Sequence, residues 1–185
     1  MIHLCAHHCP TPPAGPLITL ASEAELPGRW VLGGERPATH VYLTWLDEHT
    51  GLHWRFEGNP PRAAWSAIGT GWPSSWPLAV WQMTTLKQHA ALKKAHDLDA
   101  TRYDIPEIIG SALYAAGTMF RALPFSARLR AFGRVDVLHD AGVCTRMCEL
   151  VLRAGEVEPG LTTLLPEALA QWARSCEGGH TRRIL

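Results

Sequence analysis

The sequence lacks an excess of charge of either sign. Its 185 residues include 17 Lys and Arg and 17 Asp and Glu, so the formal net charge is zero at neutral pH. Neither sign gathers into a block, whereas proteins that bind nucleic acid or an anionic membrane usually carry basic patches. The composition therefore predicts that nucleic acid is not a partner of this protein.

Long apolar runs are also missing. No stretch approaches the roughly 18 consecutive apolar residues of a membrane-spanning helix. Residues 1–6 (MIHLCA) do not place a basic segment before an apolar one, as a signal peptide does. We therefore expect no transmembrane segment and a protein that is cytoplasmic as synthesised. Delivery to the cell wall by phage lysis or by a secretion system stays open.

A disulfide framework is missing too, because the five cysteines are odd in number and follow no framework spacing, which indicates reduced thiols. In the segment 1–14, His3, Cys5 and His7 would share one face of an extended strand, and such ligands suit zinc. The second ligand pair that a structural zinc site needs is absent. We therefore expect an irregular arm over 1–14 without metal or cofactor, and a metal- or partner-binding arm is the alternative.

The length fits one domain, which we place at 15–176, followed by a flexible tail at 177–185. Strand-like segments come first and helical periodicity comes later, which predicts an α+β fold with a small antiparallel sheet packed against helices. The expected strands are 17–20, 40–46, 52–57 and 78–83, and the expected helices are 85–98, 105–123, 143–154 and 166–175.

A thiol opens one of these helices. The run GVCTRMCELVL at 142–152 places Cys144 at the start of an apolar helical segment. Unpaired backbone N–H groups and the helix dipole favour a thiolate at that position. This pattern predicts a nucleophile, whereas the alternative is a small buried hydrophobic residue, which is how we interpret Cys148 one turn later.

A nucleophilic thiol needs a base, and His40 begins the strand-like run HVYL at 40–43. Two residues of the next strand, His53 and Glu57, could orient its ring. A hairpin loop of four residues would place His40 directly opposite Glu57, with Cβ atoms about 5 Å apart. A loop longer by one residue would turn Glu57 to the other face. We predict a catalytic set of Cys144, His40 and Glu57, and the alternative is a structural histidine at position 40.

In this order the residues resemble the circularly permuted papain-like cysteine hydrolases of the NlpC-type superfamily (YiiX/YaeF-like branch), in which the cysteine helix comes late in the chain. The matching segments are GPLI at 15–18, THVYL at 39–43, WRFEG at 54–58, RYD at 102–104, CTRMC at 144–148 and LPEAL at 165–169. The chain departs from the family pattern at Pro16, Arg146 and Cys148, where the family has Asp, Glu and Val.

The resemblance implies a papain-like fold and attack of the Cys144 thiolate on an amide or ester carbonyl, with His40 moving the proton. It places Tyr103, Asp104 and Thr145 near the substrate, although a Tyr-Asp pair before a helix is also typical of an N-cap. Backbone N–H groups at the start of the cysteine helix would meet the oxyanion.

Relatives of this kind cleave peptidoglycan amide bonds or transfer and hydrolyse acyl groups. We expect a peptidoglycan amidase or endopeptidase, with a peptide or other small molecule as substrate. The alternatives are a lipid acyl hydrolase or acyltransferase, for which the tryptophan-rich stretch 54–81 could line a groove, and a non-catalytic binding module. The sequence does not predict the oligomeric state.

Overall fold

The computed structural model describes residues 1–8, 14–26, 31–32, 36–69, 78–106, 109–110, 113, 141–161 and 163–185. In this part of the chain an 8-stranded sheet has the order β7-β6-β4-β3-β2-β1-β5-β8. Neighbouring strands are antiparallel, apart from the parallel pair β6 and β7. The predicted α+β class is confirmed.

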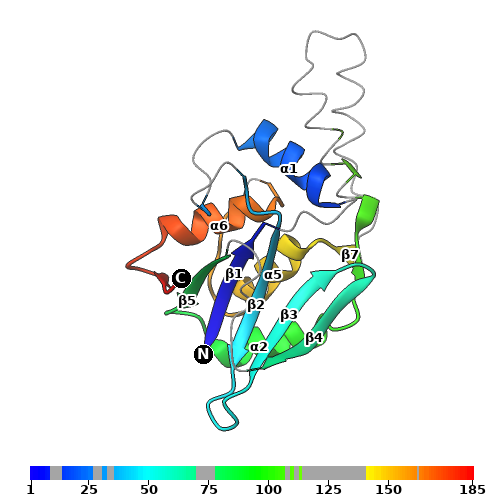
Figure 1. Cartoon of the computed structure of the whole chain (residues 1–185). Helices are drawn as coiled ribbons and strands as arrows, with labels where there is room; N and C mark the ends of the chain where they lie inside the picture. Colours follow the sequence, from blue (N-terminus) through cyan, green and yellow to red (C-terminus); the bar gives the residue numbers. More distant parts are fainter. Residues whose placement is uncertain are drawn as a thin grey trace, which may run out of the picture.

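The strands are β1 (Ile2–His7), β2 (His40–Leu46), β3 (His53–Asn59), β4 (Arg62–Gly69), β5 (Leu78–Met83), β6 (Arg102–Tyr103), β7 (Ala141–Gly142) and β8 (Thr181–Arg183). The helices are α1 (Ala14–Glu25), α2 (Gln88–Asp97), α5 (Cys144–Ala154) and α6 (Pro166–Ser175) (Figure 1).

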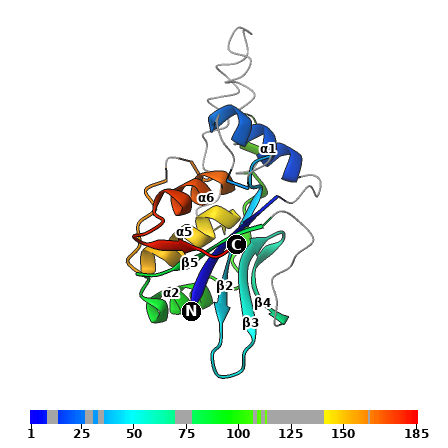
Figure 2. The same ribbon diagram turned by 60° about the vertical axis from the view of Figure 1, so that its left-hand side comes forward.

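The helices α2, α5 and α6 lie on one side of the sheet, as the rotated view shows (Figure 2). Because side chains alternate along a strand, every second residue points toward these helices. The hydrophobic core is therefore formed by Leu4, Leu43, Phe56 and Trp81 from the strands, packed with helix residues such as Met147, Val151 and Leu169. None of the described helices is long and apolar enough to cross a membrane.

The expected irregular arm is wrong for residues 2–7, which form the interior strand β1. This strand pairs with β2 and with β5, so that Leu4 lies opposite both Leu43 and Trp81. The signal was the alternation of Ile2, Leu4 and Ala6, all buried on the helix side. The two histidines of the same strand, His3 and His7, concealed this alternation. Burial of this apolar face outweighs the irregular appearance of the segment.

Two further expectations are wrong. The predicted strand at 17–20 is part of α1, because Ile18, Ala21 and Ser22 follow helical spacing and are buried together. The predicted flexible tail forms β8, which pairs with β5 through Met83 opposite Thr181. The Thr181 hydroxyl donates to the Ala173 carbonyl oxygen at 2.6 Å, which fixes the tail against α6.

The remaining helices agree with the sequence. The helices α2, α5 and α6 occupy the segments predicted for them, and α6 begins with Pro166 as expected of a proline in a first helical turn. Of the helix predicted at 105–123, residues 105–106, 109–110 and 113 are helical, and the rest lies outside the described residues.

Candidate active site

Helix α5 places a thiol at its first position. Val143 precedes it in an extended conformation with φ −84° and ψ 168°, and no side chain caps the helix. The first hydrogen bond of the helix runs from the Met147 N–H to the Val143 carbonyl at 3.0 Å, so the N–H groups of 144–146 precede the helical ladder. Cys144, which is 1 % exposed, therefore lies where partial positive charge gathers.

A glycine on β3 lets the strand approach this helix end. A Cβ atom at Gly58 would lie 3.1 Å from Cys144 Cα and 3.0 Å from Met147 Cγ. A side chain at this position would require Met147 or the first turn of α5 to give way by a few tenths of an ångström. Gly58 therefore fixes the distance between β3 and the cysteine.

Tyr103 and Asp104, two of the residues predicted to contact substrate, also lie near Cys144, through the pairing of β6 with β7. In the parallel pair of β6 and β7, Tyr103 lies opposite Gly142, two residues before Cys144. Both Tyr103 and Asp104 are buried. Residues 105 and 106 are helical, so Asp104 also precedes a helix, as the N-cap interpretation expected. The structure thus brings this pair close to the cysteine in the fold.

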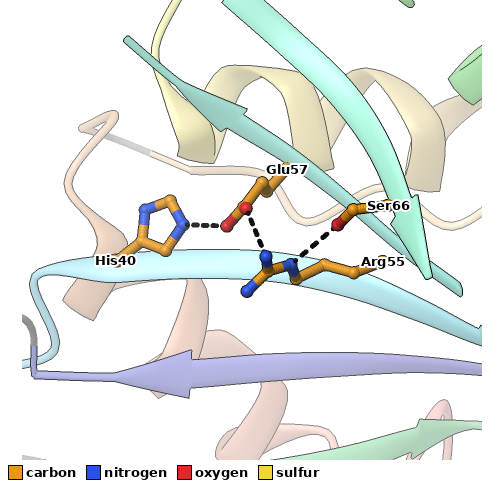
Figure 3. Close-up of polar contacts among 4 residues, drawn as sticks. All are labelled: His40, Arg55, Glu57 and Ser66. Carbon is orange, nitrogen blue, oxygen red and sulfur yellow. Dashed lines mark hydrogen bonds and ion pairs between the residues drawn. The ribbon is translucent and has the colours of Figure 1, made fainter. Parts of the chain in front are cut away.

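His40 and Glu57 also meet, although not by the predicted register. Nε2 of His40 lies 3.1 Å from Oε2 of Glu57 (Figure 3). The expected register is wrong by two residues, because Leu46 pairs with His53 rather than with Gly51. A shift of two residues keeps every side chain on its face of the sheet, so Glu57 still reaches the ring, now from a diagonal position.

The turn chemistry accounts for the longer loop. The Asp47 backbone N–H donates to the Leu52 carbonyl, and the Gly51 N–H donates back to the Asp47 carbonyl. The Asp47 carboxylate also accepts bonds from the His49 N–H and the Thr50 hydroxyl. Gly51 has φ +69°, which suits glycine. Six residues therefore connect the strands, rather than four.

The His40 ring also hydrogen-bonds to Cys144, so the two predicted partners are joined. Burial would lower the pKa of His40, but the charge of the Cys144 thiolate and the bonds to Cys144 and Glu57 raise it to about 10. Because Nε2 faces Glu57, Nδ1 is the nitrogen left for the sulfur. Burial would likewise raise the pKa of Cys144, and the imidazolium lowers it below its usual value instead. The geometry favours a thiolate–imidazolium pair.

Two more groups favour the thiolate. The backbone N–H of Val41 donates to the Cys144 sulfur, which helps to lower the pKa of that thiol. The hydroxyl of Thr145 also lies close enough to the sulfur to lower the pKa of the thiol. Among the described residues this buried hydroxyl has no well-aligned hydrogen-bond partner of its own. Thr145, predicted to contact substrate, thus lies beside the nucleophile.

Glu57 is the centre of a longer polar chain that sequence reasoning missed. Its Oε1 lies 3.1 Å from Nη2 of Arg55, and Nε of Arg55 donates to the Ser66 hydroxyl at 3.3 Å (Figure 3). Burial would raise the pKa of Glu57, whereas the bond to His40 and the charges of His40 and Arg55 hold it below its usual value. Strand alternation in HWRFEG could have shown that Arg55 and Glu57 share a face.

His7 is a second histidine at the site and was also missed. It lies opposite His40 on β1, with ring centroids 5.1 Å apart. Burial and the nearby charge of His40 lower its pKa to about 3, so its ring is neutral in ordinary buffers. The assignment of residues 1–14 to an irregular arm hid this neighbour, because only a strand pairing could reveal it.

A buried carboxylate holds the chain that leads into His40. Glu167, in the first turn of α6, accepts hydrogen bonds from the Val31 N–H at 2.9 Å and the Ala38 N–H at 2.7 Å. Burial raises its pKa. The segment before β2 is thereby tied to the helix layer, and no motif in the sequence identified this role.

The residues that could have held zinc in the alternative interpretation of 1–14 do not form a metal site in the described part of the chain. No group of three or more His, Cys, Asp or Glu residues there could hold a metal ion. His3 stacks on His53 with ring centroids 6.5 Å apart, and Cys5 lies 3.9 Å from the Thr44 hydroxyl.

The arrangement can perform nucleophilic chemistry. A thiolate at a helix N-terminus, a hydrogen-bonded imidazole and a carboxylate that orients the ring are the parts of a thiol nucleophile and its acid–base partner. Comparison with known proteins found no matching family model, no matching curated protein and no matching solved structure.

Proposed function

We propose that this protein is a papain-like cysteine hydrolase that cleaves an amide or ester bond. One observation carries the proposal, which is that Cys144 at the start of α5 hydrogen-bonds to His40, whose Nε2 lies 3.1 Å from Glu57. Burial without these partners would suppress the thiolate, as it does for the other buried thiols. The contacts of Cys144 with His40, and of His40 with Glu57, therefore favour the thiolate form of Cys144.

The reaction begins when the thiolate sulfur attacks the carbonyl carbon, forming a C–S bond and an oxyanion. The N–H groups that precede the helical ladder of α5 would donate to that oxygen. His40 then gives its proton to the leaving nitrogen or oxygen, whose bond to carbon breaks, and an acyl-enzyme results. Water, deprotonated by His40, attacks the thioester and releases the carboxylic acid and the thiolate.

Glu57 supports these proton transfers without exchanging a proton itself. Its carboxylate fixes the rotation of the His40 ring, so that Nδ1 points to the sulfur. Its negative charge also stabilises the imidazolium that stands beside the thiolate. Thr145, whose hydroxyl lies near the Cys144 sulfur, would contact either the sulfur or the bound carbonyl group.

The order of these parts supports a permuted papain-like arrangement, because the histidine strand precedes the cysteine helix. The matching segments at 39–43, 54–58 and 144–148 coincide with β2, β3 and α5. The segment GPLI at 15–18 lies in a helix and gives the resemblance no support. The proposed family therefore depends on the site segments.

A peptidoglycan amide bond is the first substrate to test. Purified peptidoglycan is incubated with the wild-type protein, and new amino groups are measured together with the soluble fragments. A parallel reaction contains acyl lipids, with free fatty acid as its readout. Cys144→Ala is the inactive control, and Cys148→Ala, which alters the other thiol of α5, is the matched active control.

The result separates the two branches of the proposal. Release of amino groups that Cys144→Ala abolishes supports an amidase, and release of fatty acid supports the acyl branch. Turnover that survives Cys144→Ala would contradict the proposed nucleophile. Absence of turnover, combined with an unreactive Cys144 thiol, would favour the non-catalytic module.

A further inference from the structure

We infer that Arg55 is a positioning residue of this site, which holds Glu57 in the orientation that supports the Cys144–His40 pair. The inference rests on the proposed function and adds a residue that the resemblance did not supply. Arg55 touches neither the sulfur nor the His40 ring in the contacts described above, and it acts through Glu57.

The two carboxylate oxygens of Glu57 have different partners. Oε2 lies 3.1 Å from His40 Nε2, and Oε1 lies 3.1 Å from Arg55 Nη2. With one oxygen held by each neighbour, the carboxylate plane cannot rotate without losing a charge-assisted bond. The Glu57 side chain is 13 % exposed, so water contributes little to these bonds.

Arg55 is itself held in place. Its Nε donates to Ser66 on the adjacent strand β4, where the two residues lie directly opposite each other. Its guanidinium carbon lies 5.8 Å from the centroid of the buried Tyr42 ring, a distance at which cations and aromatic rings attract. The side chain is 28 % exposed, and three strands fix its position.

The guanidinium shape matters here as well as its charge. Bonding Ser66 through Nε and Glu57 through Nη2 uses two nitrogens of one planar group, which a lysine cannot reproduce. A lysine would keep the positive charge and lose one of the two bonds. The two contributions of Arg55, charge and geometry, can therefore be separated by substitution.

The charged groups around Glu57 come from three strands. They are His40 on β2, Arg55 on β3 and, only when it is protonated, His7 on β1. His7 is neutral in ordinary buffers, so Arg55 and the imidazolium are the cations that oppose burial. Loss of Arg55 would release one oxygen of the Glu57 carboxylate and let the group rotate away from His40. The ion pair that supports the imidazolium would then be weaker, and the pKa of the Cys144 thiol should rise.

The test is an ultraviolet titration of the thiolate, in which Cys144→Ser gives the baseline for each background. The variants are Arg55→Gln, Arg55→Lys and Ser66→Ala. Arg182→Gln is the matched control, because Arg182 bonds Gln82 at 2.6 Å on the distant edge of the same sheet. Circular dichroism verifies folding, and turnover is not needed for the readout.

We expect Arg55→Gln to raise the apparent pKa of Cys144 by about one unit, a tenfold loss of thiolate in weak acid. Arg55→Lys should recover part of this loss, Ser66→Ala should cause a smaller one, and Arg182→Gln none. An unchanged titration in folded Arg55→Gln would overturn this inference and leave the proposed function standing. If Arg55→Gln does not fold, equal titrations of Arg55→Lys, Ser66→Ala and wild type would overturn it. A wild type whose Cys144 titrates as an ordinary thiol would overturn both the inference and the proposed function.

Discussion

Cys144 and Cys148 lie one turn apart on α5 and are equally buried, at 1 % and 0 % exposure. Burial raises the pKa of Cys148, and nearby negative charges, the Cys144 thiolate first among them, raise it further. Burial acts in the same direction on Cys144, but His40, the Val41 N–H and Thr145 reverse the shift. The two thiols thus have the same exposure but opposite pKa shifts. The groups that contact the sulfur, rather than its exposure, determine whether the thiol is protonated.

The largest effect should come from removing the imidazole. His40→Ala leaves Cys144 buried without its cation, so its pKa should rise above the ordinary thiol value as that of Cys148 does. We expect the rate of substrate cleavage to fall by about 10²–10⁴-fold. Steady-state kinetics with whichever substrate is identified provides the measurement. A variant that keeps more than half of the wild-type rate would show that the two thiols do not differ through His40.

The next effect concerns pH. The active pair needs the Cys144 thiolate and a protonated His40, so the alkaline limit of activity is set by His40 and activity is lost as the pH rises through about 10. Glu57→Gln removes a negative charge that raises this pKa, so the alkaline limb of kcat/KM should move to lower pH. His53→Gln, on the same strand face, is the control. An alkaline limb that stays in place would mean that Glu57 does not support the imidazolium.

A smaller effect is expected from crowding the helix end. Gly58→Ala places a methyl group 3.0 Å from Met147 Cγ and 3.1 Å from Cys144 Cα, so Met147 or the first turn of α5 must give way. We expect about 1–3 kcal/mol of lost stability and roughly tenfold lower activity. Gly179→Ala, where the nearest atom would be 3.6 Å away, is the control for denaturation and kinetics. Equal behaviour of the two variants would show that the approach of β3 does not position Cys144.

The smallest effect should come from the second thiol. Cys148→Ala removes a buried sulfur from an apolar environment, which should lower the free energy of unfolding by about 1 kcal/mol. Activity and the titration of Cys144 should stay close to wild type. Urea denaturation and the substrate assay test both statements. A loss of activity comparable to that of His40→Ala would place Cys148 in the chemistry and remove the contrast within α5.

Local periodicity was enough to predict the helices around the site. The apolar spacing in 143–154 and the proline at 166 specify α5 and α6 without reference to the rest of the fold. The β2–β3 hairpin could be predicted from the alternation of apolar residues and from its turn residues. Glu57 still reaches His40 because the register error was two residues, which keeps each side chain on its face of the sheet. An error of one residue would have placed Glu57 on the opposite face.

The pairing of β1 could not be predicted in the same way. The pairing of strands that are distant in sequence depends on the whole sheet, and the two histidines within residues 2–7 conceal the apolar alternation. The missing strand also hid His7, which only the pairing with β2 brings to His40. Glu167 was hidden for a related reason, because its partners are backbone N–H groups, which every sequence contains.

The most direct measurement is the alkylation of each cysteine by iodoacetamide as a function of pH, followed by mass spectrometry in wild type and His40→Ala. Cys148 is the internal control, since it shares the helix and the burial of Cys144. We predict that at pH 6 Cys144 reacts much faster than Cys148, Cys5 or Cys176, and that His40→Ala removes most of this advantage. Equal rates for Cys144 and Cys148, or an advantage that survives His40→Ala, would contradict an activated thiol–imidazole pair.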